Sequence, residues 1–172
     1  MKVEKVVVGS LRENCYLIEK DNHLLIVDPG DEAEKIKQKI GDRQVDAILI
    51  THHHFDHVGA LDALQNTYHV PVYANDNCTE QEYKISSFTF TVIDTKGHTD
   101  DSITFYFEKE GIMFVGDFLF KGTIGRCDLE NSNIEEMKKS LEKIKKYPDV
   151  VVYPGHGEKT RLATEKQTNP YL

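Results

Sequence analysis

Hydrophobic and polar positions alternate along most of the chain with the short period of β-strands, interrupted by a few stretches of helical period. Three strand-like segments open the chain, and a Pro-Gly turn ends the last of them: residues 3–9, 14–20 and 23–30. Acids then precede Ile36 and Ile40, which lie four positions apart, and this spacing predicts a short amphipathic helix over residues 31–40.

A buried strand leads into the most unusual part of the sequence. Residues 45–51 form a continuous apolar run, which is typical of a strand covered on both faces. The chain passes directly from this strand into "THHHFDH", residues 51–57. Apolar residues at three-residue spacing then predict a helix over residues 58–68.

The second half repeats this organisation. Five segments have strand-like composition: residues 70–75, 88–95, 102–108, 111–117 and 149–157. A strong amphipathic helix is predicted over residues 133–147, and a short polar helix is expected near the end of the chain. The apolar stripe of the strong helix comprises Ile134, Met137, Leu141 and Ile144. We expect a single α/β domain over residues 1–172, with two layers of sheet covered by helices.

Charge and composition exclude several classes of protein. The 29 acidic residues outnumber the 21 basic ones, so the chain carries a net charge of −8 and is expected to repel nucleic acid. No apolar run reaches the length needed to span a membrane, and the N-terminus does not resemble a secretion signal. Three widely spaced cysteines predict free thiols in a reducing compartment. We therefore expect a cytoplasmic protein.

The geometry of residues 51–57 decides whether their side chains can share a metal ion. On a helix, His52 and His54 would point in nearly opposite directions. In an extended segment, alternate residues share a face, so His52, His54 and Asp56 converge while His53 points away. A zinc-protease helix is excluded, because its motif requires a glutamate at the position that His54 occupies.

Three later strand ends each place one potential ligand beside a glycine: His98, Asp117 and His156. Sites collect at strand ends in layered α/β folds, and glycine permits close approach. Together with the first cluster these residues supply seven donors: His52, His54, Asp56, His57, His98, Asp117 and His156. Seven are too many for one zinc-like ion, which takes three or four protein ligands, and suit two ions with a shared carboxylate. Two divalent ions would leave a small positive charge that attracts an anionic substrate.

The motif series T-H-x-H-x-D-H, G-H-T, G-D and P-G-H-G resembles that of the metallo-β-lactamase-fold hydrolases. With "GDFLFKGTIGRCDL", residues 116–129, the chain looks most like the small glyoxalase II-like members, the hydroxyacylglutathione hydrolase-like proteins. The resemblance implies a four-layer αβ/βα sandwich of two mixed sheets flanked by helices, with metals at one edge of the sheets.

The resemblance also implies a role for each ligand. His52, His54 and His98 would hold the first metal. Asp56, His57 and His156 would hold the second, with Asp117 bridging the two ions. The nucleophile would be a water or hydroxide between the two ions. Asp56 would also orient this hydroxide or take part in proton transfer. The cofactors would be two divalent ions, zinc in the first place, although iron and manganese suit the same donors.

The substrate implied by the resemblance is a small acyl thioester such as S-lactoylglutathione. Full-length glyoxalase II enzymes carry a helical C-terminal extension that binds glutathione, whereas this sequence ends soon after "PGHG". Glutathione specificity therefore does not follow. Lys121 and Arg126 are the candidates for binding a substrate carboxylate. Asp28, Thr51 and Thr99 are expected to orient the metal ligands by hydrogen bonding.

Two other functions fit the same residues. A persulfide dioxygenase shares much of the ligand series but uses a single iron. A non-catalytic metal-binding protein would be expected to have lost a ligand, yet all seven positions are filled. His23 and His69 lie outside the motifs and are interpreted as surface residues, and Cys127 has no base near it in the sequence. Neither the thiol carrier nor the oligomeric state follows from the sequence.

Overall fold

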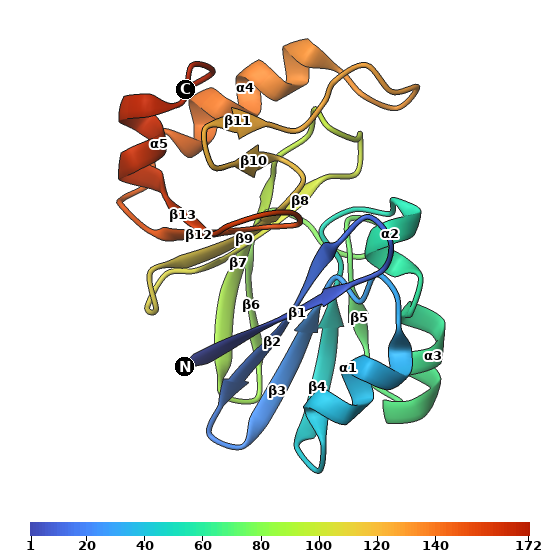
Figure 1. The fold of residues 1–172 in the computed structure, drawn as a ribbon. Helices are drawn as coiled ribbons and strands as arrows, with labels where there is room; N and C mark the ends of the chain where they lie inside the picture. Colours follow the sequence, from blue (N-terminus) through green and yellow to red (C-terminus); the bar gives the residue numbers. More distant parts are fainter.

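The computed structural model describes residues 1–172 and consists of two facing β-sheets between outer layers of helices (Figure 1). The first sheet has the strand order β1-β2-β3-β4-β5 and the second β13-β12-β9-β8-β7-β6. Both are mixed, because β3, β4 and β5 run parallel to one another, as do β9 and β12, while the other pairs are antiparallel. The expected four-layer sandwich is confirmed.

The first sheet comes from the N-terminal half and the second from the C-terminal half. The strands of the first sheet are β1 (Lys2–Val8), β2 (Glu13–Lys20), β3 (His23–Val27), β4 (Gln44–Leu49) and β5 (Val72–Tyr73). Those of the second are β6 (Glu82–Ile85), β7 (Phe88–Asp94), β8 (Ile103–Phe107), β9 (Ile112–Gly116), β12 (Val151–Pro154) and β13 (Thr160–Arg161). A separate two-stranded hairpin is formed by β10 (Leu119–Phe120) and β11 (Thr123–Ile124).

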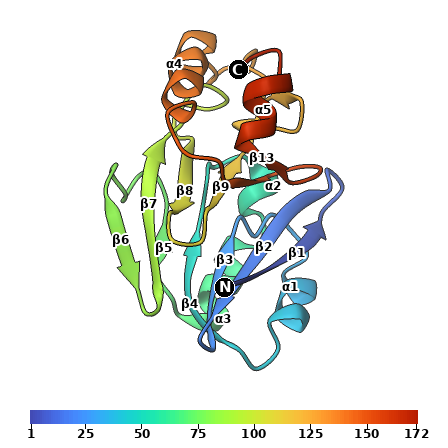
Figure 2. The same cartoon turned by 90° about the vertical axis from the view of Figure 1, so that its left-hand side faces the viewer.

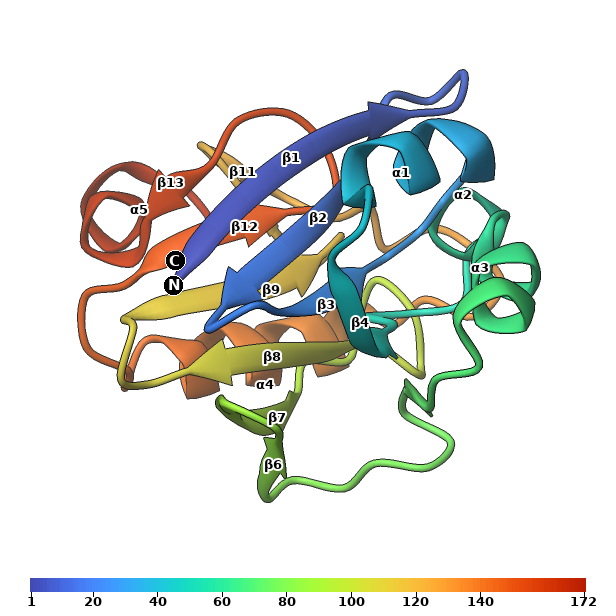
Figure 3. The ribbon, with the colours of Figure 1, turned by 90° about the horizontal axis from the view of Figure 1, so that it is seen from below.

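Helices cover the outer face of each sheet (Figures 2 and 3). The first sheet is flanked by α1 (Ala33–Ile40) and α3 (Leu61–Tyr68), with the short α2 (Phe55–Val58) beside them. The second is flanked by α4 (Ile134–Ile144) and α5 (Leu162–Thr168). None of these helices combines the length and apolar character that crossing a bilayer requires.

Three hydrophobic clusters join the four layers. The central cluster lies between the sheets, where side chains of the first sheet such as Ile18 and Leu49 meet an aromatic layer from β7, β8 and β9. A second cluster joins the first sheet to α1 and α3, and a third joins the second sheet to α4 and α5. Central strands such as β3, β8 and β9 therefore bury both faces, which explains the continuous apolar runs in the sequence.

The helix α4 illustrates how local sequence sets an element. The side chain of Asn133 caps it by accepting hydrogen bonds from the backbone N–H groups of Glu135 and Glu136, at 2.9 and 3.2 Å. Met137, Leu141 and Ile144 are buried as predicted, but Ile134, in the first turn, is exposed. The expected stripe is thus one residue shorter than the sequence pattern.

Several boundaries differ from the sequence prediction. The helix expected over residues 58–68 begins only at Leu61, as α3, and Val58 ends α2; between them the N–H of Ala60 donates to the Pro29 carbonyl at 2.9 Å instead of within a helix. Strand β6 and the β10–β11 hairpin were not expected, and the strand expected over 70–75 is only Val72–Tyr73. These short elements are determined by pairing with distant segments rather than by their own composition.

The aromatic layer should dominate the stability of the fold. Phe90 is buried, and its ring centroid lies 5.6 Å from that of Phe105 and 5.4 Å from that of Phe107. We expect Phe90→Ala to reduce the free energy of unfolding by about 3–5 kcal/mol, measured by urea denaturation. The matched change Phe55→Ala, at a side chain that is 74% exposed, should alter it by less than about 0.5 kcal/mol. Equal effects at the two positions would contradict this account of the core.

Candidate metal centre

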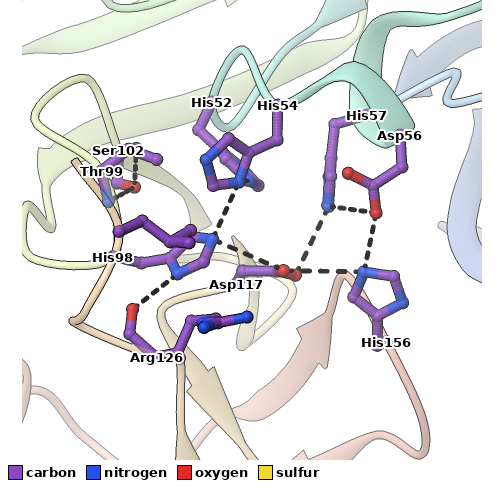
Figure 4. Close-up of polar contacts among 12 residues, drawn as sticks. His52, His54, Asp56, His57, His98, Thr99, Ser102, Asp117, Arg126 and His156 are labelled. Atoms are coloured by element: carbon purple, nitrogen blue, oxygen red, sulfur yellow. Dashed lines mark hydrogen bonds and ion pairs between the residues drawn. The ribbon is translucent and has the colours of Figure 1, made fainter. Parts of the chain in front are cut away.

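Strand ends bring the predicted ligands together at one edge of the sandwich. The histidine cluster follows β4, His98 lies between β7 and β8, Asp117 follows β9, and His156 follows β12. Figure 4 shows all seven side chains facing a common centre, with two groups on either side of Asp117. The structure thus brings together every residue that the sequence singled out as a ligand.

The first group consists of three histidines whose inner nitrogens nearly touch. Nδ1 of His54 lies 3.1 Å from Nε2 of His52 and 3.0 Å from Nε2 of His98. On the outer side of the ring, Nδ1 of His98 lies 2.9 Å from the backbone carbonyl of Arg126. A carbonyl oxygen can only accept a hydrogen bond, so this Nδ1 is the donor and carries a proton. In the neutral ring, Nε2 then carries a lone pair.

The same reasoning applies to His52. The hydroxyl of Thr51 donates to the Asp28 carboxylate at 2.6 Å, so it accepts from Nδ1 of His52, which lies 3.1 Å away. Nε2 of His52 is therefore also a lone pair. Two lone pairs and one Nδ1 within hydrogen-bonding distance cannot all be satisfied by one proton, whereas a metal ion accepts all three lone pairs at once.

The second group is built around His57, which is completely buried. Its Nδ1 donates to Asp28, at 3.1 Å, and its Nε2 faces Asp56 at 4.0 Å and Asp117 at 3.4 Å. Nε2 of His156 lies 3.2 Å from the carboxylate of Asp56. Asp56, His57 and His156 thus offer two imidazole nitrogens and a carboxylate oxygen to one point, which is a second set suited to a metal ion.

Asp117 lies between the two groups. Its Oδ2 is 3.6 Å from Nε2 of His98 in the first group and 3.5 Å from Nε2 of His156 in the second. Its Oδ1 and Nε2 of His57 are buried, and neither makes a hydrogen bond. Buried polar atoms without partners are costly, and a bound cation would satisfy both. The donor set therefore fits divalent metal ions, and its geometry places Asp117 where a bridging carboxylate would lie.

The electrostatics of the metal-free site show the same division. Burial, reinforced by neighbouring imidazoles, holds the pKa of His52 and of His54 below the ordinary range. Burial would also lower the pKa of His57, but the carboxylates of Asp117 and Asp28 outweigh it and raise this pKa. Asp56 likewise raises the pKa of His156. The second group thus favours positive charge, which its carboxylates stabilise.

Asp28 connects the two groups from beneath. Its carboxylate accepts from the backbone N–H of Thr51 at 2.7 Å, from the Thr51 hydroxyl, and from His57. The residue adopts the left-handed conformation, with φ of 48°, which aspartate tolerates better than most residues. One side chain therefore orients His57 directly and His52 through Thr51. Asp28 and Thr51 lie where the sequence analysis expected ligand-orienting residues.

The turn that carries His156 is held by β2. The Asn14 side chain donates to the carbonyls of Pro154 and Gly157, at 3.0 and 3.1 Å, and the Tyr16 hydroxyl donates to Pro154 at 2.7 Å. A Cβ at Gly155 would lie 2.4 Å from Oδ1 of Asp117, so only glycine permits this approach. The "PGHG" turn is therefore fixed by the opposite sheet as well as by its own strand.

Some expectations about this region need correction. The extended geometry applies to His52 and His54, but Asp56 lies in the helical turn of α2. In a fully extended chain Asp56 and His57 would point to opposite faces, whereas consecutive positions of a helical turn allow both to face the centre. The Thr99 hydroxyl pairs with Ser102, at 2.6 Å, and makes no hydrogen bond to a ligand side chain.

The remaining histidines lie outside the centre. His53 points away from the two groups, as expected, and its Nδ1 lies 2.6 Å from Asp101. His69 is exposed. His23 is only partly exposed, because its ring pairs with Asp46 at 2.7 Å.

The candidate substrate residues lie on the segment that follows Asp117, and each is paired with a neighbouring acid. Lys121 contacts Glu158 at 2.6 Å, and Arg126 contacts Asp128 at 2.7 Å. All four side chains are more than half exposed, so these pairs contribute little stability. Both cations are therefore available to exchange their partners for a substrate anion.

Two features of the site were missed in the sequence. The backbone carbonyl of Arg126, rather than its side chain, orients His98. Glu13 is buried beside Asp28 and His57 with no hydrogen bond to either carboxylate oxygen. Burial, with the adjacent Asp28, raises the pKa of Glu13 to about 10. The sequence gave no indication that Glu13 is buried, because an acid at the end of a strand ordinarily faces solvent.

Removing the Asp28 carboxylate should weaken metal binding. The Asp28 carboxylate accepts hydrogen bonds from Thr51 and His57. In Asp28→Asn, the NH₂ group would face one of these donors and could not accept its hydrogen bond, so the orientation of His57 and Thr51 would no longer be fixed. We expect metal affinity to fall by about 10–100-fold, measured by competition with a chromophoric chelator. Glu110→Gln, which removes an ion pair with Lys20 at the opposite end of β8 and β9 from the site, is the control and should retain wild-type affinity. Unchanged affinity in Asp28→Asn would contradict the orienting role.

Metal binding should weaken as the pH falls. The carboxylates that raise the pKa of His57 and of His156 favour protonation of these rings, so protons compete with a metal ion for their nitrogens and compete more strongly as the pH falls. Calorimetric titration with metal in two buffers of different ionisation enthalpy should therefore report proton release. Identical apparent enthalpies in the two buffers would show that no proton is displaced.

Comparison with known proteins agrees with this geometry. The family model of the metallo-beta-lactamase superfamily matches residues 8–80 and 75–156. The chain is 33% identical to the probable metallo-hydrolase YqgX of Bacillus subtilis, covering 100% of this chain and 98% of that protein. It is 30% identical to the hydroxyacylglutathione hydrolase GloC of Haemophilus influenzae, with the same coverage.

Solved structures give the same result. BLEG-1, a B3 metallo-beta-lactamase, superposes with a TM-score of 0.95 at 31% identity, covering 99% of both chains. TTHA1623 in a di-iron-bound form superposes with a TM-score of 0.91 at 32% identity, covering 98% of this chain and 100% of that one. The fold, the two groups of donors on either side of Asp117 and the sequence matches together show that this chain belongs to the metallo-β-lactamase superfamily.

Proposed function

We propose that the protein is a binuclear metal-dependent thioesterase of the glyoxalase II type, which hydrolyses a small acyl thioester such as S-lactoylglutathione. The observation that carries this proposal is the position of Asp117. Its carboxylate lies close to His98 of the first donor group and to His57 and His156 of the second. His52, His54 and His98 would hold one ion, and Asp56, His57 and His156 the other. The donors suit zinc, and also iron or manganese.

The chemistry needs few groups from the protein beyond the ligands. Two bound divalent ions supply Lewis acidity and can lower the pKa of water to about 7. Water adds to the thioester carbonyl, the C–S bond breaks, and the products are a carboxylic acid and a thiol. Burial alone would raise the pKa of Asp56, but its contacts with His156 and His57 outweigh this and lower it. Asp56 is therefore an ionised carboxylate that can orient the attacking water by accepting a hydrogen bond from it, whereas its lowered pKa makes it a weak proton acceptor.

Arg126 and Lys121 are proposed to bind an anionic part of the substrate. The backbone carbonyl of Arg126 itself orients His98, so a substrate held by the guanidinium of the same residue would lie near the first donor group. The guanidinium already makes a bidentate contact with the Asp128 carboxylate, in which Nε donates to Oδ1 at 2.7 Å and Nη2 donates to Oδ2 at 2.9 Å. This is the geometry in which arginine binds carboxylates in general. A substrate carboxylate would replace Asp128.

The relatives support this class of reaction. GloC, named as a hydroxyacylglutathione hydrolase, aligns with the whole of this chain and with 98% of its own length. Thioester hydrolysis is thus the activity named for a relative of matching extent. The thiol carrier is left open by this proposal, because the residues offered for binding recognise an anion and not a particular carrier.

A persulfide dioxygenase with a single iron is the alternative enzyme. The second donor group favours the binuclear hydrolase, because Asp56, His57 and His156 converge on one point just as His52, His54 and His98 do, which offers places for two ions. A bound metal count of one iron per chain, with oxygen consumed in the presence of a persulfide, would support the alternative.

The proposed activity can be tested with metal-replete protein and S-lactoylglutathione, following release of the free thiol. We expect turnover by the wild type and two metal ions per chain by elemental analysis. Asp117→Ala should lose metal and lower kcat/KM by more than the roughly 10–100-fold typical of losing an outer partner of a metal ligand. Glu110→Gln, far from the donors, serves as the control. Two bound metals without any thioester turnover would refute the proposal.

The substrate role of Arg126 gives a pair of opposite expectations. Arg126→Ala should raise KM severalfold and leave kcat nearly unchanged, because the side chain does not contact the metal ligands. Asp128→Asn should lower KM, because it removes the acid that competes for the guanidinium. Steady-state kinetics of both variants distinguish this role from an ordinary surface ion pair, for which neither parameter would change.

A further inference from the structure

The segment between Asp117 and Arg126 connects the two ends of the candidate site. It begins with the proposed bridging carboxylate and ends with the carbonyl that orients His98. Between them lies the β10–β11 hairpin, whose two-residue turn is Lys121 and Gly122. The hairpin belongs to neither large sheet, so sheet pairing does not fix its position.

Two buried polar residues of the C-terminal segment contact this hairpin. Glu165 in α5 is 1% exposed, and Asn169, which follows the helix, is 4% exposed. A glutamate is almost never fully buried unless its carboxylate is paired, so such burial calls for a specific partner. Figure 1 shows α5 running beside the β10–β11 hairpin.

The partners of Glu165 lie on both sides of it. Oε2 accepts from the backbone N–H of Gly122, in the hairpin turn, at 2.8 Å. Oε1 accepts from the hydroxyl of Thr160 in β13 at 2.6 Å. The carboxylate therefore links the tip of the hairpin to the edge strand of the second sheet through charge-assisted hydrogen bonds, which are the stronger kind.

Asn169 contacts the two residues that flank the turn of the same hairpin. Its Nδ2 donates to the carbonyl of Thr123 at 3.1 Å, to that of Phe120 at 3.4 Å, and to Oε2 of Glu165 at 2.9 Å. Phe120 and Thr123 are paired residues of β10 and β11, so one amide bridges the two short strands. The Glu165–Asn169 pair thus contacts the hairpin at three backbone groups.

We propose that Glu165 and Asn169 are positioning residues for substrate binding, which act by fixing the β10–β11 hairpin and with it Lys121 and Arg126. This inference rests on the proposed function, because it assigns those two cations to the substrate anion. The pair contacts the backbone of the hairpin and none of the seven metal ligands. Loss of the pair therefore affects how tightly the substrate is held and leaves the metal-dependent step intact.

The hydrophobic core restrains the strands of the hairpin, because Leu119 is fully buried in the third cluster and Ile124 packs against it, but neither residue belongs to the turn. Lys121 reaches Glu158 across the turn, but both side chains are more than half exposed, and exposed ion pairs contribute little. A Cβ at Gly122 would meet nothing within 4 Å, so that side of the turn faces open space. The buried carboxylate is the strong restraint on this turn.

The test compares four variants in the metal-loaded, full-length protein. Glu165→Ala and Asn169→Ala should raise KM for S-lactoylglutathione severalfold with kcat and metal content nearly unchanged. Glu165→Gln should restore most of the wild-type KM, because its amide oxygen can accept from Gly122 while its NH₂ donates to Thr160. Thr168→Ala is the matched control, since the Thr168 hydroxyl bonds only within α5 to the carbonyl of Thr164, and it should behave as wild type.

A second measurement does not depend on activity. Trypsin cleaves after lysine, and Lys121 lies in the hairpin turn, so Glu165→Ala and Asn169→Ala should accelerate cleavage between Lys121 and Gly122, with mass spectrometry identifying the site. If Glu165→Ala does not fold, Asn169→Ala takes its place: it should be cleaved faster than the wild type, whereas Glu165→Gln should be cleaved at the wild-type rate.

Each outcome separates this inference from the proposed function. An unchanged KM in the alanine variants, or a fall in kcat and metal content without a change in KM, would overturn the positioning role while wild-type turnover stands. A wild type without thioesterase activity refutes the proposed function instead, and the proteolysis then decides whether the pair restrains the hairpin. Equal cleavage rates in wild type and alanine variants would show that it does not.

Discussion

The convergence of unprotonated nitrogens and carboxylates at one sheet edge is the constraint on which the rest of this structure depends. Lone pairs of His52, His54 and His98 face one another, and Asp117 and His57 bury polar atoms that make no hydrogen bond. Such a set is unfavourable without a cation, so the surrounding structure must hold it in place. Two rigid sheets, joined by an aromatic core, do so by supplying the ligands from strand ends.

The strands position the metal ligands, and hydrogen bonds to the outer nitrogens of the histidine rings fix their orientation. Asp28 fixes His57 and, through Thr51, His52, while the Arg126 carbonyl fixes His98. Each contact sets which ring nitrogen carries the proton, and hence which nitrogen is free to bind metal. The segment after Asp117 has two duties, because it orients one ligand and carries the candidate substrate cations. Its restraint by buried residues near the C-terminus connects substrate binding to a part of the fold far from the metals in sequence.

Much of the fold and the ligand set was accessible from the sequence. The apolar runs of β3, β4 and β9 predict buried strands, and each ends at a polar residue that faces the site. The errors concern short elements. Helix α2 begins inside the histidine cluster, and β6 and the β10–β11 hairpin have little periodicity of their own. Four residues or fewer give too weak a local preference to predict, and such elements form only where distant segments pair with them.

The sequence by itself determined which donors are present, their order along the chain and the layered class of the fold, because strand burial and ligand chemistry are written in local composition. The tertiary structure alone decided how those donors meet. It placed Asp117 between the two groups, set the protonation of each imidazole through partners such as Asp28, and buried Glu165 against Gly122, 43 residues away in the chain. Such contacts depend on long-range packing, which local periodicity does not encode.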